Sequence, residues 1–218
     1  MKTPLLIYGA GGLGRELLSL VHALENFEVI GFLDDHIPRD TTVKGITVLG
    51  GAEVLRSFEK PINVVLAFGD PAMKAAKAVS IPHNLVRYPQ IIHPRAILQD
   101  SSSIKIGPGS VLCAGVVLTT DIVIGDHTLI NLNCTVGHDS RIGSFCSLMP
   151  GVHVSGEVLI SNEVLIGAGA TILNQLEIGA KAKIGMGSVV IRNVDAGLMV
   201  AGVPAQPMVS RPHPKFQS

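Results

Sequence analysis

The chain has 218 residues, of which 47% are hydrophobic, and equal numbers of basic and acidic side chains, 17 of each. This length allows one large domain or two small ones with a buried core, and the balanced charge, without a basic run, gives no support to a nucleic-acid or membrane-surface partner. No apolar run reaches the ~18 residues of a membrane span and the first residues lack a signal-peptide pattern, so we expect no membrane insertion, a cytoplasmic protein and small-molecule ligands.

Residues 4–21 read as an apolar strand, a glycine-rich turn and a helix with one apolar face. Gly9, Gly11 and Gly14 in this turn fit the spacing G-x-G-x-x-G. Glycines at this spacing let the backbone of a turn approach phosphate groups at the beginning of a helix. The segment therefore predicts the first half of a nucleotide-binding βαβ unit.

Two more strands and a short helix complete this region. A strand over 27–35 ends in Asp34 and Asp35, a strand over 63–69 ends at Gly69, and a helix is expected over 70–79. An acid beyond the second strand of such a unit can bind a ligand hydroxyl. We therefore predict a small Rossmann-like α/β domain over residues 1–88.

Three interpretations of the glycine turn stay open at this point: a nicotinamide dinucleotide site, a sugar-nucleotide site, or a tight turn with a structural role only. The ~88 residues before the next region are too few for a six-stranded dinucleotide fold, and nothing downstream is typical of a hydride-transfer site. The pattern favours a sugar nucleotide.

A six-residue repeat organises the second half of the chain. Counting in sixes from Ile106 to Val190 gives fifteen positions that are all Ile, Leu or Val; the next position is glycine in seven of them, and the fifth place is always small or aliphatic. A period of six suits a short strand followed by a sharp corner, where glycine tolerates unusual backbone angles. Three hexads close one triangular turn, so residues 106–195 predict five turns of a parallel β-helix.

The narrow interior of such a coil explains why aromatic residues make up only 4% of the chain and tryptophan is absent. Cys134 and Cys146 occupy fifth places, where we expect them to fill the core as reduced thiols rather than act as nucleophiles. His127 and His153 lie at other places of their hexads and are expected on the surface. No cysteine or histidine pair has ligand spacing, so no metal site is predicted.

His138 and Asp139 stand side by side in the segment "VGHDS". His138 has the third place of its hexad, outside the aliphatic stack, where a polar residue is tolerated without any function. Histidine is also the side chain whose ordinary pKa suits a base at neutral pH. From these residues alone, both a catalytic base and a surface histidine remain possible.

The order of "IYGAGGLGREL", "GFLDD", "IIHPRA", the hexads, "HDSRIG" and "AGVPA" resembles the bacterial hexapeptide-repeat acetyltransferases that modify sugars. The amino-nucleotide-sugar N-acetyltransferases and the sialic acid O-acetyltransferases are most similar in pattern, over nearly the whole chain. The resemblance implies a left-handed β-helix over residues 89–218, with a C-terminal tail. It also implies a homotrimer that binds acetyl-CoA between neighbouring coils and holds the sugar nucleotide against the next subunit.

The resemblance also implies roles for individual residues. His138 would be the general base that removes a proton from the acceptor as it attacks the thioester, Asp139 would orient the imidazole, and Asn131 would lie near the acceptor. The residues that match cofactor contacts of the family are Ser147, Gly156, Ala168, Gly185, Met186 and Gly187. Those that match sugar-nucleotide contacts are Gly9, Ala10, Gly11, Gly12, Asp34, Asp35 and Gly69.

The chain departs from the family pattern at three positions. Many relatives have histidine where Leu13 stands, several have a cofactor-contacting histidine where this chain has Ser147, and a basic residue commonly replaces Gln206. We expect the first departure to alter the contact with the sugar and the other two to weaken cofactor binding.

The predicted activity is transfer of an acetyl group from acetyl-CoA to the amine of an amino nucleotide sugar, for bacterial surface-glycan biosynthesis. The alternatives are O-acetylation of sialic acid or another sugar, and a non-catalytic hexapeptide scaffold or nucleotide-sugar sensor.

Overall fold

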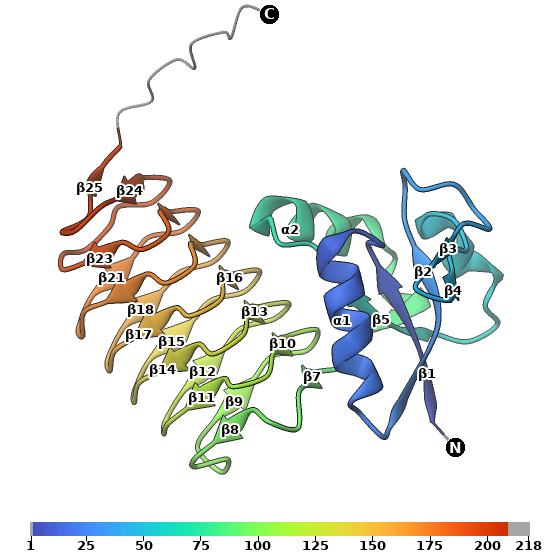
Figure 1. The fold of residues 1–218 in the computed structure, drawn as a ribbon, viewed down its shortest axis with the longest axis horizontal. Helices are drawn as coiled ribbons and strands as arrows, with labels where there is room; N and C mark the ends of the chain where they lie inside the picture. Colours follow the sequence, from blue (N-terminus) through green and yellow to red (C-terminus); the bar gives the residue numbers. More distant parts are fainter. Residues whose placement is uncertain (1, 209–218) are drawn as a thin grey trace, which may run out of the picture.

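The computed structural model describes residues 2–208 and has two parts, an N-terminal α/β domain and a prism-shaped coil beside it (Figure 1). The chain forms a parallel sheet first and then a solenoid of stacked parallel strands, which confirms the predicted fold class. The expected C-terminal tail beyond residue 208 lies outside the described residues.

The N-terminal domain is built on a four-stranded parallel sheet in the order β2-β1-β5-β6. Its strands are β1 (Thr3–Tyr8), β2 (Phe27–Leu33), β5 (Ile62–Leu66) and β6 (Val86–Arg87). The connections contain helix α1 (Gly12–His22), strands β3 (Thr42–Val43) and β4 (Ile46–Thr47), the short helix η1 (Ala52–Ser57), helix α2 (Pro71–Ser80) and the short helix η2 (His83–Leu85).

Alternation along β1 divides the core of this domain into two layers, because successive side chains of a strand point to opposite faces. Leu5 and Ile7 pack in one cluster with the apolar face of α1, and Leu6 and Tyr8 pack in the other with η1 and α2 residues. Helices therefore cover both faces of the sheet, which leaves the carboxyl ends of its strands free to form a site.

The coil has three strips of short strands, one on each side of the prism. Sheet I contains β7 (Ile91–Ile92), β10 (Val111–Leu112), β13 (Leu129–Ile130), β16 (Ser147–Leu148), β19 (Leu165–Ile166), β22 (Lys183–Ile184), β24 (Met199–Ala201) and the antiparallel β25 (Gln206–Pro207). Sheet II contains β8 (Ile97–Leu98), β11 (Val117–Leu118), β14 (Thr135–Val136), β17 (His153–Val154), β20 (Thr171–Ile172) and β23 (Val189–Val190). Sheet III contains β9 (Lys105–Ile106), β12 (Val123–Ile124), β15 (Arg141–Ile142), β18 (Leu159–Ile160) and β21 (Glu177–Ile178).

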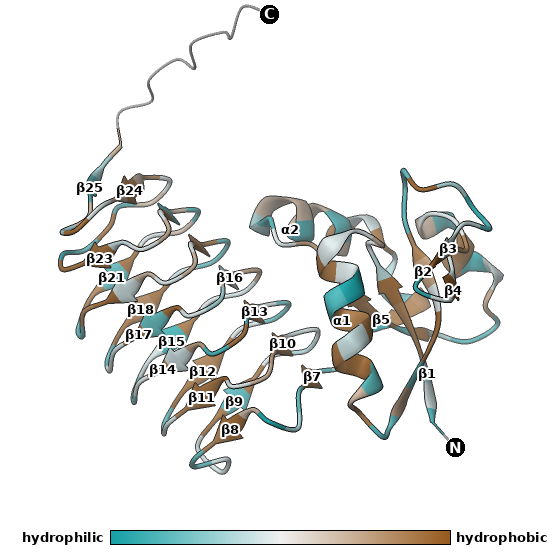
Figure 2. Ribbon diagram, in the orientation of Figure 1, coloured by the Kyte–Doolittle hydropathy of each residue, from teal (hydrophilic) through white to brown (hydrophobic). Residues whose placement is uncertain are grey.

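From β9 to β23 each strand residue stacks on the residue eighteen positions later, as in the pairing of Val117 with Thr135 and of Leu118 with Val136. The spacing is twenty residues where β7 and β8 pair with the next turn, and sixteen between β22 and β24. The second residue of each strand points inward and joins one continuous aliphatic core that contains no aromatic side chain. Hydrophobic residues consequently recur on the strands turn after turn (Figure 2). Cys134 and Cys146 are fully buried in this core, as their places in the hexads predicted.

The sharp corners lie at the fourth place of each hexad, two places later than the glycine pattern indicated. From Gly109 to Gly187 every fourth-place residue has a φ between +53° and +76°. The second-place glycines do not have a positive φ, so backbone conformation does not explain why glycine is needed there. A Cβ atom on Gly137 would lie 2.6 Å from the backbone nitrogen of Gly156 in the next turn. Close stacking of the turns, not corner geometry, therefore requires these glycines.

The N-terminal domain is packed against sheet I. The outward-facing residues Ile91, Val111 and Leu129 are buried in the same cluster as the α1 residues Leu17 and Leu20. Farther along the coil the outward residues of this sheet are exposed, as at β22 and β24. The two parts therefore share a core at the first turns of the coil.

A second contact between the two parts is polar and buried. Lys74 of α2 is only 2% exposed, and its Nζ donates hydrogen bonds to the carbonyl oxygen of Cys146, at 2.9 Å, and to Oγ of Ser147, at 3.0 Å. His127 is 7% exposed and stacks on Phe145 with ring centroids 5.1 Å apart. The expectation that His127 lies on the surface is wrong, because the N-terminal domain covers its corner of the coil.

We predict that Gly167→Ala lowers the free energy of unfolding by about 1–3 kcal/mol, the usual cost of overpacking. The added Cβ would lie 2.5 Å from the backbone nitrogen of Met186. Urea denaturation would measure the loss. Gly169→Asn is the matched control, because its corner has φ +70° and open space, and asparagine tolerates that angle. An equal or larger loss in the control would contradict the stacking explanation.

We also predict that acidification destabilises the protein through His127. Burial, followed by the charges of Lys74 and His83, lowers the pKa of His127 to about 4. Between this value and the ordinary 6.5 the unfolded chain binds a proton that the folded chain excludes, so stability falls as the pH drops through that window. Thermal denaturation at pH 7 and pH 4 should show a smaller loss for His127→Asn, by about 3 kcal/mol. An unchanged pH dependence in this variant would contradict the assignment, and His22→Asn, at an exposed histidine, is the control.

Candidate functional site

The corners of the prism form three edges, named here by the sheet that precedes them. Edge 1 follows the strands of sheet I, edge 2 follows those of sheet II, and edge 3 follows those of sheet III. Edges 1 and 2 therefore border the two sides of sheet II. The candidate site residues of the coil fall on these two edges, except Ser147, which lies in β16.

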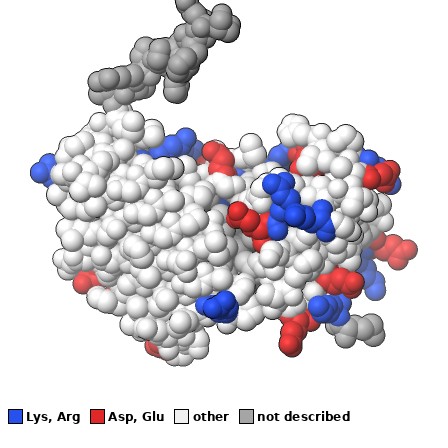
Figure 3. Space-filling model, in the orientation of Figure 1, with Lys and Arg blue, Asp and Glu red and all other residues white. Residues whose placement is uncertain are grey.

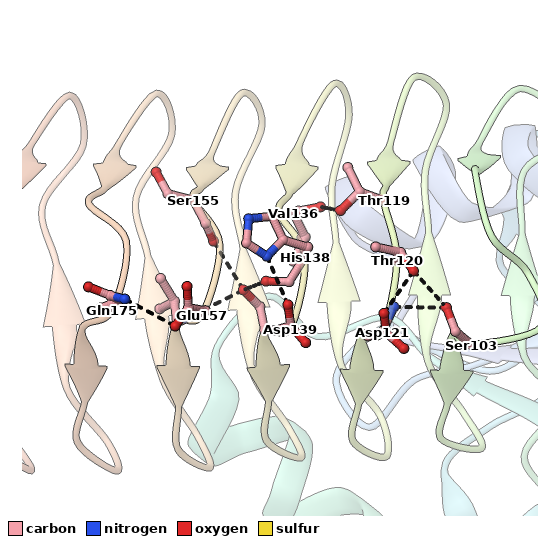
Figure 4. Close-up of polar contacts among 12 residues, drawn as sticks. Ser103, Thr119, Thr120, Asp121, Val136, His138, Asp139, Ser155, Glu157 and Gln175 are labelled. Atoms are coloured by element: carbon pink, nitrogen blue, oxygen red, sulfur yellow. Dashed lines mark hydrogen bonds and ion pairs between the residues drawn. The ribbon is translucent and has the colours of Figure 1, made fainter.

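His138 and Asp139 lie on edge 2, between β14 and β15, and both side chains are more than half exposed. Nδ1 of His138 and Oδ2 of Asp139 are 2.8 Å apart, and the two side chains point toward each other (Figure 4). A carboxylate accepts a hydrogen bond, so the paired Nδ1 carries the proton and Nε2 is left with its lone pair. The arrangement can therefore accept a proton from a ligand at Nε2.

The next turn of the coil holds this pair in position. The carbonyl oxygen of His138 accepts a hydrogen bond of 2.7 Å from the backbone nitrogen of Glu157. The imidazole lies against Gly156, where a Cβ atom would come within 2.6 Å of Nε2. Glycine at this place therefore leaves room for the ring, and His138, Asp139 and Gly156 form one group.

Five other expected coil residues lie on edge 1. Ala168, Gly185, Met186 and Gly187 follow β19 and β22, and Met186 is 79% exposed. Asn131 follows β13 and is only 5% exposed, and its Oδ1 accepts a hydrogen bond of 2.7 Å from the backbone nitrogen of Leu132. Within one chain, the structure does not bring Asn131 together with His138.

Ser147 does not fit its expected role. It lies in β16 beneath α2, it is fully buried, and its hydroxyl accepts the hydrogen bond from Lys74. The expectation that this hydroxyl contacts a cofactor is wrong, because the side chain faces the domain contact rather than the coil surface. Nothing in the local sequence signals this, since Lys74 is 73 positions away.

The glycine turn forms the opening of α1. Gly9 has φ +107°, and a Cβ atom on Gly14 would overlap the carbonyl oxygen of Gly9, so both positions require glycine. Gly11 caps the helix without any side-chain hydrogen bond, and the space beside Gly11 and Gly12 is open. A helix begins with unpaired N–H groups that attract anions. This turn can therefore hold a phosphate.

Asp34 lies beside the turn, and its carboxylate already has internal partners. It accepts hydrogen bonds from the backbone nitrogens of Ala10, His36 and Ile37 at 2.9–3.0 Å. Burial alone would raise the pKa of this carboxyl, but the three amides outweigh burial and lower it. Asp34 thereby fixes the turn at Ala10 to the end of β2.

Asp35 is held in a similar way. Both of its oxygens accept from the hydroxyl of Tyr8 at 2.8 Å, and one also pairs with Nζ of Lys77. Burial would raise the pKa of Asp35, but Lys77 and Tyr8 more than offset this effect and lower it. The two acids of the predicted site therefore shape its wall through internal hydrogen bonds.

A hollow of about 310 Å³ joins the glycine turn to edge 1. Its lining includes Gly12 and Gly69 of the N-terminal domain and Asn131 of the coil. Leu13 also lines it, and the remaining lining residues were not predicted from the sequence: Glu16, Leu129, Leu132, Met149 and Pro150. They belong to the site only because the domain packs on the coil.

Within residues 2–208, no three or more His, Cys, Asp or Glu side chains gather as a metal ion would require. None of the helices in the same range combines the length and the apolar character needed to cross a membrane.

Comparison with known proteins identifies both parts of the chain. Residues 4–81 match the PglD N-terminal domain, and residues 95–120 and 157–192 match the hexapeptide repeat of succinyl-transferase. The chain is 32% identical to GDP-perosamine N-acetyltransferase of Escherichia coli O157:H7, over 94% of this chain and 96% of that protein.

Solved structures agree over both parts. The acetyltransferase domain of PglB from Neisseria gonorrhoeae FA1090 superposes with a TM-score of 0.88 at 31% identity, over 95% of this chain and 100% of that one. A histidine-to-asparagine mutant of perosamine N-acetyltransferase from Caulobacter crescentus, solved with CoA and GDP-perosamine, also gives a TM-score of 0.88, at 28% identity over 95% and 97% of the two chains.

These matches define the class of the protein as an acetyltransferase with hexapeptide repeats. The chain belongs to the hexapeptide-repeat sugar acetyltransferases that carry a PglD-type N-terminal domain, as the sequence resemblance indicated. It is an enzyme, so the scaffold alternative is set aside.

Proposed function

We propose that the protein transfers an acetyl group from acetyl-CoA to the amine of an amino sugar carried by a nucleoside diphosphate. The relatives support the reaction class, since one is named for N-acetylation of GDP-perosamine and another was solved with CoA and GDP-perosamine. A further PglB structure holds acetyl coenzyme A. The observation that carries the proposal is the exposed His138–Asp139 pair with its free Nε2.

His138 is the general base in this proposal. Nε2 takes a proton from the acceptor amine as its nitrogen attacks the thioester carbonyl carbon. The carbon–sulfur bond then breaks, and the CoA thiolate leaves with the proton returned by the imidazolium. Asp139 stabilises the imidazolium while it carries the charge. No covalent intermediate on the protein is needed.

The N-terminal domain binds the acceptor. Its diphosphate lies at the beginning of α1, where Gly11 and Gly12 offer N–H groups in open space. The sugar extends from there into the hollow beside Asn131. Sugar-nucleotide binding at the carboxyl ends of parallel strands is usual for this kind of domain.

The two halves of this site belong to different copies of the chain. The acceptor hollow opens at edge 1, whereas His138 stands on edge 2, and both edges border sheet II. A closed ring in which edge 2 of one copy meets edge 1 of the next unites them and turns sheet II toward the axis. We propose a homotrimer of this kind, with acetyl-CoA in the groove between neighbouring coils.

The side chains of sheet II support this arrangement. Its outward-facing residues carry no Lys, Arg, Asp or Glu: Ile97, Val117, Thr135, His153, Thr171 and Val189. Those of sheet III include Lys105, Arg141 and Glu177. Interfaces between subunits are depleted in charge at their centre. On the face drawn in Figure 3, charged side chains gather over the N-terminal domain and the coil is mostly uncharged.

The product, an N-acetylated nucleotide sugar, would serve bacterial surface-glycan biosynthesis. A cytoplasmic location is also proposed, and it is supported by three buried free thiols at Cys113, Cys134 and Cys146.

We predict that the purified protein releases CoA from acetyl-CoA in the presence of one amino nucleotide sugar. The measurement uses UDP-, GDP- and dTDP-linked amino sugars, with sialic acid as a hydroxyl acceptor. His138→Ala should reduce turnover by at least about 100-fold, the lower range for loss of a general base. His22→Ala, at a remote exposed histidine, should retain it. CoA release with sialic acid alone would contradict N-acetylation and indicate transfer to a hydroxyl group.

We predict that two inactive variants restore activity when they are co-expressed. Gly12→Asp places a negative charge where the diphosphate binds, and the open space beside Gly12 lets the variant fold. His138→Ala removes the base. If each site takes its N-terminal domain and its base from different copies, random assembly of the two variants leaves about a quarter of all sites intact. Co-expression of His138→Ala with His138→Asn is the control. No recovery beyond this control would contradict the shared site.

A further inference from the structure

Two adjoining hollows form one groove between α1 and edge 1. The first, of about 310 Å³, reaches Gly12 and Gly69, and the second, of about 260 Å³, reaches His93 and Cys113. Three residues line both: Glu16, Asn131 and Leu132. The groove therefore runs from the glycine turn along α1, with Glu16 at the point where the two hollows join.

Glu16 is one helical turn beyond Gly12, on the face of α1 that looks toward the coil. Residues four apart on a helix lie on the same face, and four residues span about 6 Å along the axis. Its carboxylate is exposed and makes no hydrogen bond or ion pair with any residue from 2 to 208. Burial, followed by the nearby Cys134 and then by the charge of Glu16, raises the pKa of the Cys113 thiol in the groove wall to about 12.

Asn131 supplies the complementary group across the groove. Its Oδ1 is occupied by the backbone nitrogen of Leu132, so its amide can still donate N–H bonds to a ligand. The groove thus offers an acceptor on α1 and a donor on the coil, above apolar walls from Leu17, Leu20 and Leu132. Apolar walls with a few convergent polar groups are typical of small-molecule sites. A sugar ring, with hydroxyls at its rim and C–H groups on its faces, fits this combination.

We propose that Glu16 is a specificity-determining residue for the acceptor: its carboxylate accepts a hydrogen bond from a hydroxyl of the sugar, while Asn131 donates one. This inference rests on the proposed function, since it requires the diphosphate at the beginning of α1. From there, the next group of the ligand lies about one helical turn along the groove, beside Glu16. Glu16 then selects sugars that carry a hydroxyl at the contacted carbon.

The test compares Glu16→Ala and Glu16→Gln with the wild type, in steady-state kinetics with the accepted sugar nucleotide. Glu16→Ala should raise KM for this substrate about 10- to 100-fold, the effect of losing a hydrogen bond to a charged group. Glu16→Gln keeps an acceptor oxygen and should lose less. Glu28→Ala, at an exposed acid of the same domain outside the groove, should behave as wild type.

Two readouts separate sugar recognition from a structural effect. The KM for acetyl-CoA and the Kd of the free nucleoside diphosphate should not change in Glu16→Ala. Among deoxy analogues of the sugar, one should give the same KM with wild type and with Glu16→Ala. That analogue lacks the hydroxyl that Glu16 contacts, so neither protein can form the hydrogen bond.

The failure of this proposal can be told from failure of the proposed function. If no sugar nucleotide is acetylated by the wild type, the function itself is wrong. If one is acetylated and Glu16→Ala has an unchanged KM, or a KM that changes equally for every deoxy analogue, Glu16 does not recognise the sugar.

Discussion

Stacking of each turn on the next, eighteen residues later in the chain, is the constraint on which the coil depends. Strand pairs such as Leu118 with Val136 join only two residues at a time, so no single pair is strong. The aliphatic stack inside the prism runs without a break through all of the turns and gives the coil its core. The second-place glycines let the backbone of one turn lie directly against the backbone of the next.

The same stacking arranges the chemistry of the coil. Residues on one corner repeat in columns along an edge, so a functional side chain is held by the turn before it and the turn after it. His138 rests against Gly156, and its carbonyl oxygen is bound by the backbone of Glu157. A backbone held in this way orients an exposed imidazole without burying it, which leaves Nε2 open to a ligand.

The N-terminal domain adds what a straight prism lacks, a concave surface. It is held on sheet I by an apolar contact through α1 and by the two buried hydrogen bonds of Lys74, one to the carbonyl oxygen of Cys146 and one to the hydroxyl of Ser147. Between these fastenings, the carboxyl ends of β1 and β5 face edge 1, and the groove beside Glu16 and Asn131 results. Lys74 thus links α2, which begins just after Gly69, to the turn of the coil that precedes Met149.

The spacing of residues within short segments determined both domains of the fold and the catalytic candidate. The six-residue period, the glycine turn and the His138–Asp139 pair are all written within short segments, so the α/β domain, the coil and the catalytic candidate could be predicted. The tertiary structure decided whatever depends on distant residues. Ser147 and His127 are buried by a domain that precedes them in the chain. Second-place glycines such as Gly137 are required by backbone nineteen residues later, at Gly156. Glu16 faces Asn131 only because α1 packs on the coil, a contact between residues more than a hundred positions apart that no local pattern encodes.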